Sequence, residues 1–168
     1  MTNTGVNRMV QRFKLLLVLT ITFFVFTGCK SKKGGKEFNV NSVIIQNLKF
    51  AGKMYPIHQS DKSVKFQFKI STLDSTNVLE YKLTNQDDYL NRIYYFSYQA
   101  ESDFSIEMNK SVIPCEGVIF ERNYNLTKDI TLTINFPVND LGKAEELTLV
   151  YDAGEFSLAP VKLKYQIN

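Results

Sequence analysis

Alternation of apolar and polar residues dominates the chain after residue 38 and predicts β-strands. In residues 64–70, Val64, Phe66, Phe68 and Ile70 alternate with lysine and glutamine, which is the pattern of a strand with one face in water. The same pattern recurs at residues 79–83, 130–136 and 161–167, and less regularly at residues 43–50, 92–100, 104–108, 112–120 and 147–151. These runs predict about eight or nine short strands.

Helical periodicity is weak, so the predicted fold class is all-β. Residues 85–91 could form one helical turn and residues 138–146 a short helix. The Asn109-Lys110 pair between two strand-like runs predicts a tight hairpin. Short strands separated by polar turns favour a single antiparallel β-sandwich over residues 38–168, with an Ig-like or transthyretin-like topology.

The first 28 residues follow a different pattern, that of an export signal. Basic Arg8, Arg12 and Lys14 precede an apolar run over residues 15–26, and small residues follow it up to Cys29. That order of basic, apolar and small residues is typical of a signal peptide. The apolar run is shorter than the roughly 20 residues that a membrane-spanning helix needs. We therefore expect residues 1–28 to be removed after export.

The end of this segment is similar to the lipobox of bacterial lipoproteins, with Gly28-Cys29 at its centre and Phe26 where leucine is commoner. The resemblance implies that Cys29 is acylated, becomes the mature N-terminus and holds the protein on a membrane. Residues 29–37 then form the lipidated cysteine and a flexible tether. Some Gram-negative lipoproteins exported to the cell exterior carry acidic residues there. This chain carries lysines, which favours the periplasm-facing side of the outer membrane.

The net charge of the folded part differs in sign from that of the whole chain once the predicted signal peptide (residues 1–28) and tether (residues 29–37) are left out. The whole chain has 20 Lys and Arg against 17 Asp and Glu, a formal charge of +3. Residues 38–168 keep thirteen of the basic residues and sixteen of the acidic ones. The folded part is mildly acidic and its sequence shows no basic stripe, so we do not expect a nucleic acid as partner.

Few residues offer catalytic or metal-binding chemistry. His58 is the sole histidine, so a metal site with two histidine ligands is excluded, and we expect no metal or cofactor. With Cys29 used for acylation, Cys115 has no disulfide partner. A Cys115–His58 nucleophile pair is one interpretation, and a buried, unreactive Cys115 is the favoured one. We therefore expect no enzymatic activity.

The most distinctive cluster of the sequence is aromatic. Tyr89, Tyr94, Tyr95, Phe96 and Tyr98 fall within ten residues. In a strand over residues 92–100, Tyr94, Phe96 and Tyr98 would share one face of the sheet. Such a row can bind a protein or a sugar, and it can equally belong to the core, because strands are rich in aromatic residues.

A second candidate site is the loop over residues 120–126, which contains Arg122 and Tyr124. Arg92 and Arg122 are the only arginines after residue 28, and arginine forms a rigid bidentate fork with a carboxylate. We expect each to hold a carboxylate such as that of Asp87, Asp88 or Glu121. The loop is then either fixed by such a pair or used to dock a partner.

Together these features predict a membrane-anchored, non-catalytic lipoprotein that binds another protein of the cell envelope. In size, tether and expected architecture it is similar to small outer-membrane lipoproteins that anchor multi-protein machines, including the lipoprotein of type VI secretion assemblies, which implies a structural subunit of a secretion or envelope assembly. The alternative is a periplasmic or surface lipoprotein that binds a small ligand or glycan through Tyr94 and Tyr98.

Overall fold

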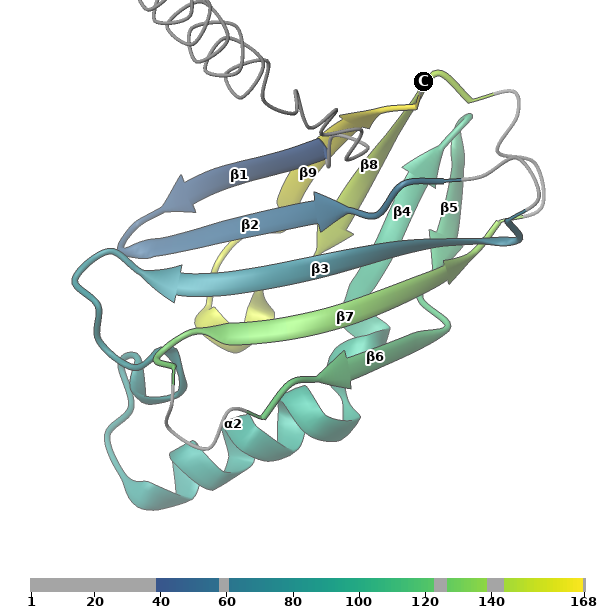
Figure 1. Cartoon of the computed structure of the whole chain (residues 1–168). Helices are drawn as coiled ribbons and strands as arrows, with labels where there is room; N and C mark the ends of the chain where they lie inside the picture. The colour runs from purple at the N-terminus through teal and green to yellow at the C-terminus, as the bar shows by residue number, and fades with distance from the viewer. Residues whose placement is uncertain (1–38, 58–60, 123–126, 139–143, 168) are drawn as a thin grey trace, which may run out of the picture. The chain divides into compact units, whose positions relative to one another are not determined.

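The structure is a computed structural model that describes residues 39–57, 61–122, 127–138 and 144–167. Cys29, the predicted signal peptide and the tether lie outside the described residues. The described chain forms nine strands, one α-helix and three short 3-10 helices (Figure 1). The strands are β1 (Asn39–Ile45), β2 (Leu48–Met54), β3 (Ser63–Thr72), β4 (Phe104–Met108), β5 (Ser111–Pro114), β6 (Gly117–Phe120), β7 (Ile130–Pro137), β8 (Glu146–Tyr151) and β9 (Val161–Gln166). The helices are η1 (Val78–Glu80), α2 (Gln86–Tyr98), η2 (Ala100–Asp103) and η4 (Gly154–Phe156).

The strands form two antiparallel sheets, which confirms that the fold is mostly antiparallel β. Sheet one has the order β1-β2-β3-β7-β6, and sheet two has the order β5-β4-β8-β9. Figure 1 shows sheet one in front of sheet two, with α2 running below β6. Apolar side chains of both sheets and of α2 belong to one hydrophobic cluster.

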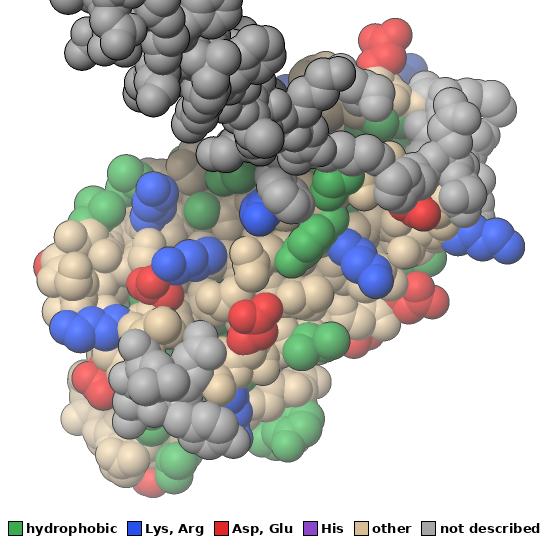
Figure 2. All heavy atoms as spheres, viewed as in Figure 1, with side chains coloured by type: hydrophobic (Ala, Val, Ile, Leu, Met, Phe, Trp, Pro, Cys, Tyr) green, Lys and Arg blue, Asp and Glu red, His purple; other side chains and the backbone are tan. Residues whose placement is uncertain are grey.

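The clearest alternation in the sequence correctly predicts β3. Val64, Phe66, Phe68 and Ile70 are fully buried, because every second side chain of a strand points to the same face. The lysines and glutamine between them point to the outer face of sheet one, which Figure 2 shows as a surface with scattered blue side chains. The strands predicted over residues 130–136 and 161–167 are confirmed in the same way as β7 and β9.

Aromatic rings join the two sheets inside the core. The ring centroid of Phe66 in β3 lies 5.1 Å from that of Tyr165 in β9. The ring of Phe68 lies 5.2 Å from Phe104 and 5.3 Å from Tyr151, both in sheet two. Since each aromatic side chain buries about 150–250 Å² of surface, these contacts are a main source of stability for the domain.

The chain crosses from sheet two to sheet one at Cys115 and Glu116, between β5 and β6. The Cys115 amide donates to the Phe104 carbonyl of β4 at 3.1 Å. The next amide, of Glu116, donates to the Asn135 carbonyl of β7 at 3.0 Å. Consecutive residues therefore hydrogen-bond to different sheets, which fixes the spacing of the sheets at this edge.

At the other edge of sheet one, side chains of β1 bond to the backbone of β9. The Asn41 side-chain amide donates to the Lys164 carbonyl, and that of Asn39 donates to the Gln166 carbonyl at 3.4 Å. No backbone ladder is described between these two strands, which belong to different sheets. The asparagine amides therefore occupy acceptors that β9 leaves unpaired at its outer edge.

The predicted hairpin at Asn109-Lys110 is confirmed. Both residues have positive φ, 50° and 66°, as a two-residue turn of type I′ requires. Met108 of β4 is paired with Ser111 of β5 directly across this turn. Asparagine tolerates the left-handed conformation better than most residues, which accounts for the signal in the sequence.

Two predictions of secondary structure are wrong. Residues 92–100 belong to α2 and the start of η2. Residues 79–83 form η1 and a turn, where the Asn77 side chain accepts from the Leu79 amide at 3.0 Å and Lys82 has a φ of 54°. The short helix predicted over residues 138–146 falls mostly on residues 139–143, which lie outside the described residues, so it stays a prediction up to the start of β8 at Glu146. No helix in the described part of the chain has the length and hydropathy needed to cross a membrane.

Candidate functional site

Helix α2 begins at a well-formed N-terminal cap. The side chain of Asn85 accepts a hydrogen bond from the Asp88 amide at 2.9 Å, and Asp87 and Asp88 lie in the first turn. Asparagine satisfies an amide that the helix leaves free, and acidic residues interact favourably with the positive end of the helix dipole. These residues explain why the aromatic segment that follows is a helix.

The helix changes the interpretation of the tyrosine row. Tyr94 and Tyr98 share one face because they are four residues apart in a helix, and their ring centroids lie 5.1 Å apart. Phe96 points the other way and is only 1% exposed. The prediction that Tyr94, Phe96 and Tyr98 form one face is therefore wrong for Phe96, which belongs to the core beside Phe120 and Phe156.

The outer side of α2 is an exposed apolar stripe that we call the aromatic face, made of Leu90, Tyr94 and Tyr98. Their exposed fractions are 54%, 55% and 76%. The spacing of four residues from Leu90 to Tyr94 to Tyr98 places all three side chains along the helix axis. Leu90 was not among the predicted site residues, although this spacing was visible in the sequence.

Arg92 holds α2 on the domain. It is 6% exposed, its Nε lies 2.8 Å from Glu155 Oε1, and its Nη1 donates to the Tyr81 carbonyl at 2.7 Å. Its guanidinium also lies 5.1 Å from the centre of the Phe156 ring. Arg92 thus binds a carboxylate as predicted, but the partner is Glu155 of η4 instead of Asp87, Asp88 or Glu121.

Tyr95 connects α2 to the floor of a pocket. Its hydroxyl donates to Asp103 Oδ2 at 2.5 Å and lies 3.4 Å from the hydroxyl of buried Tyr151. Burial raises the pKa of Tyr95, and the neighbouring Tyr151 and Asp103 raise it further. Burial also raises the pKa of Tyr151. Both phenols therefore stay protonated and act as hydrogen-bond donors at neutral pH.

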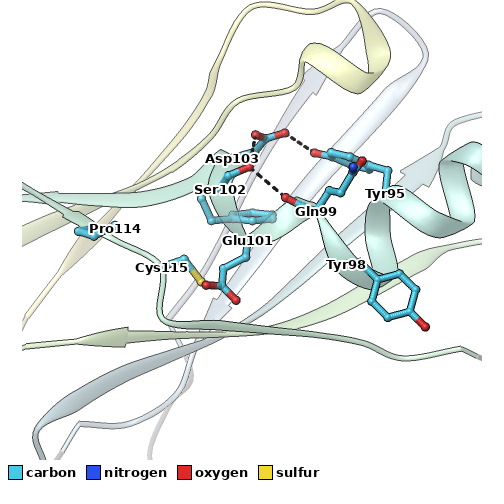
Figure 3. Close-up of a pocket in the computed structure, with 9 residues that line it drawn as sticks. Tyr95, Tyr98, Gln99, Glu101, Ser102, Asp103, Pro114 and Cys115 are labelled. Atoms are coloured by element: carbon cyan, nitrogen blue, oxygen red, sulfur yellow. Dashed lines mark hydrogen bonds between the residues drawn. The ribbon is translucent and has the colours of Figure 1, made fainter.

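An open pocket of about 660 Å³ lies between the C-terminal end of α2, η2 and the β5–β6 crossing. Figure 3 shows Tyr95 pointing toward Asp103, and Tyr98 pointing outward at the rim. Glu101 and Cys115 also contribute to the wall. Neither lysine nor arginine is among the described residues that line the pocket, so its character is acidic and aromatic.

Cys115 is a partly buried free thiol in the wall of this pocket. Its Sγ lies 3.3 Å from the Gly117 carbonyl and 3.4 Å from the Asn135 carbonyl. Burial is the main reason why the pKa of the thiol is raised, and the Glu101 carboxylate adds to the effect. A raised pKa reduces the thiolate that a nucleophile needs. His58, the other member of the hypothetical pair, lies outside the described residues.

The predicted docking loop is described only in part. Arg122 is exposed two residues after the end of β6, and Tyr124 lies outside the described residues. Glu121 accepts a hydrogen bond from the Thr133 hydroxyl at 3.1 Å. A role of Arg122 and Tyr124 in docking stays a prediction.

Within the described residues, no three His, Cys, Asp or Glu side chains are grouped so that they could hold a metal ion. Comparison of the chain with protein families, with curated proteins and with solved structures finds no match. The candidate site is therefore defined by its own geometry: an exposed aromatic face on a firmly held helix, with an acidic pocket at its C-terminal end.

Proposed function

We propose that this chain is a membrane-anchored, non-catalytic lipoprotein whose β-domain binds another cell-envelope protein through the aromatic face of α2. The observation that carries the proposal is the exposure of Leu90, Tyr94 and Tyr98 in one stripe. Tyrosine contributes a large contact area at a low cost in conformational entropy, and its hydroxyl tolerates water before binding. The aromatic face therefore suits a surface that is buried by a partner.

The position of α2 supports this role because the helix is already fixed before binding. Arg92 bonds to Glu155 and to the Tyr81 carbonyl from the inner side of the helix. A binding surface that is ordered in advance loses less entropy on association. Asp87, Asp88 and Glu101 flank the aromatic face in sequence, so we propose a partner surface that is apolar with basic groups around it.

The finer architecture and the anchor are part of the same proposal. Two antiparallel sheets that share one core are consistent with an Ig-like or transthyretin-like β-sandwich. Acylation of Cys29 would hold this domain on the periplasm-facing side of the outer membrane. The Cys29→Ala variant tests the anchor, because it should lose labelling by a fatty-acid probe and remain uncleaved.

Site-specific crosslinking in intact cells tests the protein partner. A photo-crosslinking residue at Tyr94 or Tyr98 should give the same discrete adduct, and one at exposed Gln166 on β9 should not. Adding Leu90→Glu to the protein that carries the crosslinking residue at Tyr98 should remove the adduct, since it places a charge at the end of the apolar stripe. Identical adducts at Tyr98 and Gln166, or an adduct unaffected by Leu90→Glu, would contradict the proposal.

The second candidate function is binding of a small ligand or glycan, and the pocket beside Tyr98 favours it. The Glu101 and Asp103 carboxylates can accept hydrogen bonds from hydroxyl groups, and Tyr98 can stack on a sugar ring at the rim. Under this function Glu101→Gln should weaken ligand binding and Leu90→Glu should not. Under the proposed protein-binding function the order of the two effects is reversed.

A further inference from the structure

The outer face of sheet one gathers basic and aliphatic side chains on three neighbouring strands. We call it the lysine face. It consists of Val40 and Ile44 on β1, Lys49 and Lys53 on β2, and Lys65 and Lys69 on β3. In Figure 2 blue Lys or Arg side chains are scattered over this face among green apolar and red acidic ones.

The strand register explains how this surface arises. Ile44 is paired directly with Lys49, and Val40 with Lys53, so each exposed aliphatic side chain lies beside a lysine on the same face. Val40 and Ile44 are 57% and 55% exposed. The sequence shows no basic stripe because these residues alternate with buried ones and lie on three separate strands.

Two of these lysines lie diagonally across neighbouring strands, where their positive charges repel each other. Lys49 is paired with Ser71 and Ala51 with Lys69, so Lys49 and Lys69 are diagonal to each other. Such neighbours lie about 7–8 Å apart, and like charges at this distance repel each other. Asp129 Oδ2 lies 2.6 Å from Lys69 Nζ, and this ion pair offsets part of the repulsion between the lysines. The arrangement becomes more favourable when an anionic surface covers it.

The outer face of sheet two is different in charge. There Lys162 Nζ forms an ion pair with Glu107 Oε1 at 2.7 Å. Lys164 lies on β9, whose neighbour β8 carries Glu146. Basic and acidic groups are balanced on that side. On sheet one the acidic groups beside the four lysines are Asp129, bound to Lys69, and Glu121, bound to Thr133 of the same outer face. The lysines outnumber them, so sheet one carries an excess of positive charge within a domain in which acidic residues outnumber basic ones.

From this geometry we propose that the lysine face lies on a surface of anionic phospholipid headgroups. Exposed aliphatic side chains beside lysines combine the two interactions that hold proteins at a membrane interface, apolar insertion and attraction to anionic lipids. Lysine is a hydrated point charge without the bidentate fork of arginine, which suits a diffuse layer of phosphates better than one defined acidic protein site.

The length of the tether makes the contact feasible. This step rests on the proposed acylation of Cys29, which would fix that residue at the bilayer surface. Strand β1 begins at Asn39, ten residues after Cys29. At no more than about 3.3–3.6 Å per residue, these residues span at most about 35 Å. The chain thus enters the domain on β1, next to the lysine-bearing strands, within reach of the bilayer.

Lysine footprinting on vesicles tests the proposal. The mature lipidated protein is incorporated into vesicles of phosphatidylcholine alone, or of phosphatidylcholine with about one-third phosphatidylglycerol, and labelled with an amine-reactive reagent. We expect Lys49 and Lys65 to be labelled at least about tenfold more slowly with phosphatidylglycerol, while Lys164 is unchanged. Protection should disappear at about 0.5 M salt, where charges are screened within a few ångströms.

Charge reversal provides the matched control. Lys49→Glu with Lys65→Glu should remove the protection of Lys53 and Lys69, whereas the equal charge change Lys110→Glu with Lys164→Glu should leave it intact. All four substituted lysines are exposed, and circular dichroism checks that each variant is folded. Loss of protection in both double variants would mean that net charge, and not the lysine face, causes the contact, and would overturn the proposal.

The outcome is separate from that of the anchor. If Cys29 carries no acyl group, the chain is simply mixed with the same preformed vesicles. Protection of its lysines only in the vesicles that contain phosphatidylglycerol still supports binding of the lysine face to anionic lipid. Equal labelling of its lysines in both vesicle types overturns the proposal and directs attention to an anionic protein partner. Protection that is equal with and without phosphatidylglycerol and insensitive to salt overturns it as well.

Discussion

Replacing Arg92 with methionine tests how α2 is attached to the domain. Methionine keeps most of the length of the side chain and removes the charge and all donors. The Tyr81 carbonyl, which accepts from Nη1 at 2.7 Å, then loses its charged donor. Glu155, bound at 2.8 Å, loses its ion-pair partner, and the Phe156 ring loses a guanidinium at 5.1 Å.

The size of the effect follows from these contacts. A hydrogen bond from a charged group contributes about 1.5–3 kcal/mol, and the cation–π contact contributes about 0.5–1 kcal/mol. The Glu155 side chain remains 25% exposed, so water partly replaces its partner and we assign this pair at most about 1 kcal/mol. Contacts to the Val78 and Leu79 carbonyls at 3.5 and 3.4 Å are too long to add much. We expect Arg92→Met to lower the free energy of unfolding by about 3 kcal/mol.

Urea unfolding followed by far-UV circular dichroism measures this loss as a lower midpoint at an unchanged slope. Arg92→Lys should lie between wild type and Arg92→Met, because lysine keeps the charge but lacks the planar fork. Lys69→Met is the matched control, since it removes an exposed pair with Asp129 and should cost no more than about 1 kcal/mol. If Arg92→Met costs no more than Lys69→Met, the reasoning about the buried guanidinium is refuted.

Three further predictions test the helix, the core and the acid response. Phe96→Ala should cost about 3–5 kcal/mol of stability and Tyr98→Ala less than about 1 kcal/mol, because Phe96 is 1% and Tyr98 76% exposed; similar losses in thermal unfolding would contradict the helical arrangement. Gly52→Ala should destabilise strongly, since its Cβ would lie 2.1 Å from the Tyr165 hydroxyl, and adding Tyr165→Phe should recover part of the loss; no recovery would mean that another contact dominates. Hydrogen bonds from Thr76 and Asn47 lower the pKa of Asp74 from 3.8 to about 2. The folded pKa lies below the unfolded one, so this stabilisation is present above about pH 4 and disappears as the pH falls toward 2. An NMR titration of Asp74 with a midpoint near 3.8 would contradict the bonds.

The strands could be predicted from the sequence where one face is buried and the other wet. Residues 64–70 show this because the buried Phe66 and Phe68 alternate with exposed or partly exposed lysine and glutamine. The same reasoning failed at residues 92–100, where aromatic residues with high strand propensity form a helix. The cap at Asn85 and the spacing of Leu90, Tyr94 and Tyr98 carried the helical signal, and the tertiary contacts of Arg92 stabilise it.

The candidate site was predictable only to a limited extent. Tyr94 and Tyr98 were identified as a common face, although for the wrong secondary structure. The pocket depends on the topology, which brings Tyr95 of α2, Asp103 of η2 and Cys115 of the crossing together. Their separation along the chain gives no sign of this proximity. The lysine face likewise depends on the register of β1, β2 and β3, which periodicity alone does not determine.

The asparagine side chains of β1 have a consequence for solubility. The outer edge of β9 would offer free carbonyl groups to a strand of another molecule, and open edges of this kind lead to edge-to-edge aggregation. Asn39 and Asn41 donate to the carbonyls of Gln166 and Lys164 at this edge. These two side chains occupy edge carbonyls that the backbone of a neighbouring strand would otherwise pair with. Copies of the protein meet whenever it is concentrated, and two amide groups reduce the chance that such encounters become permanent.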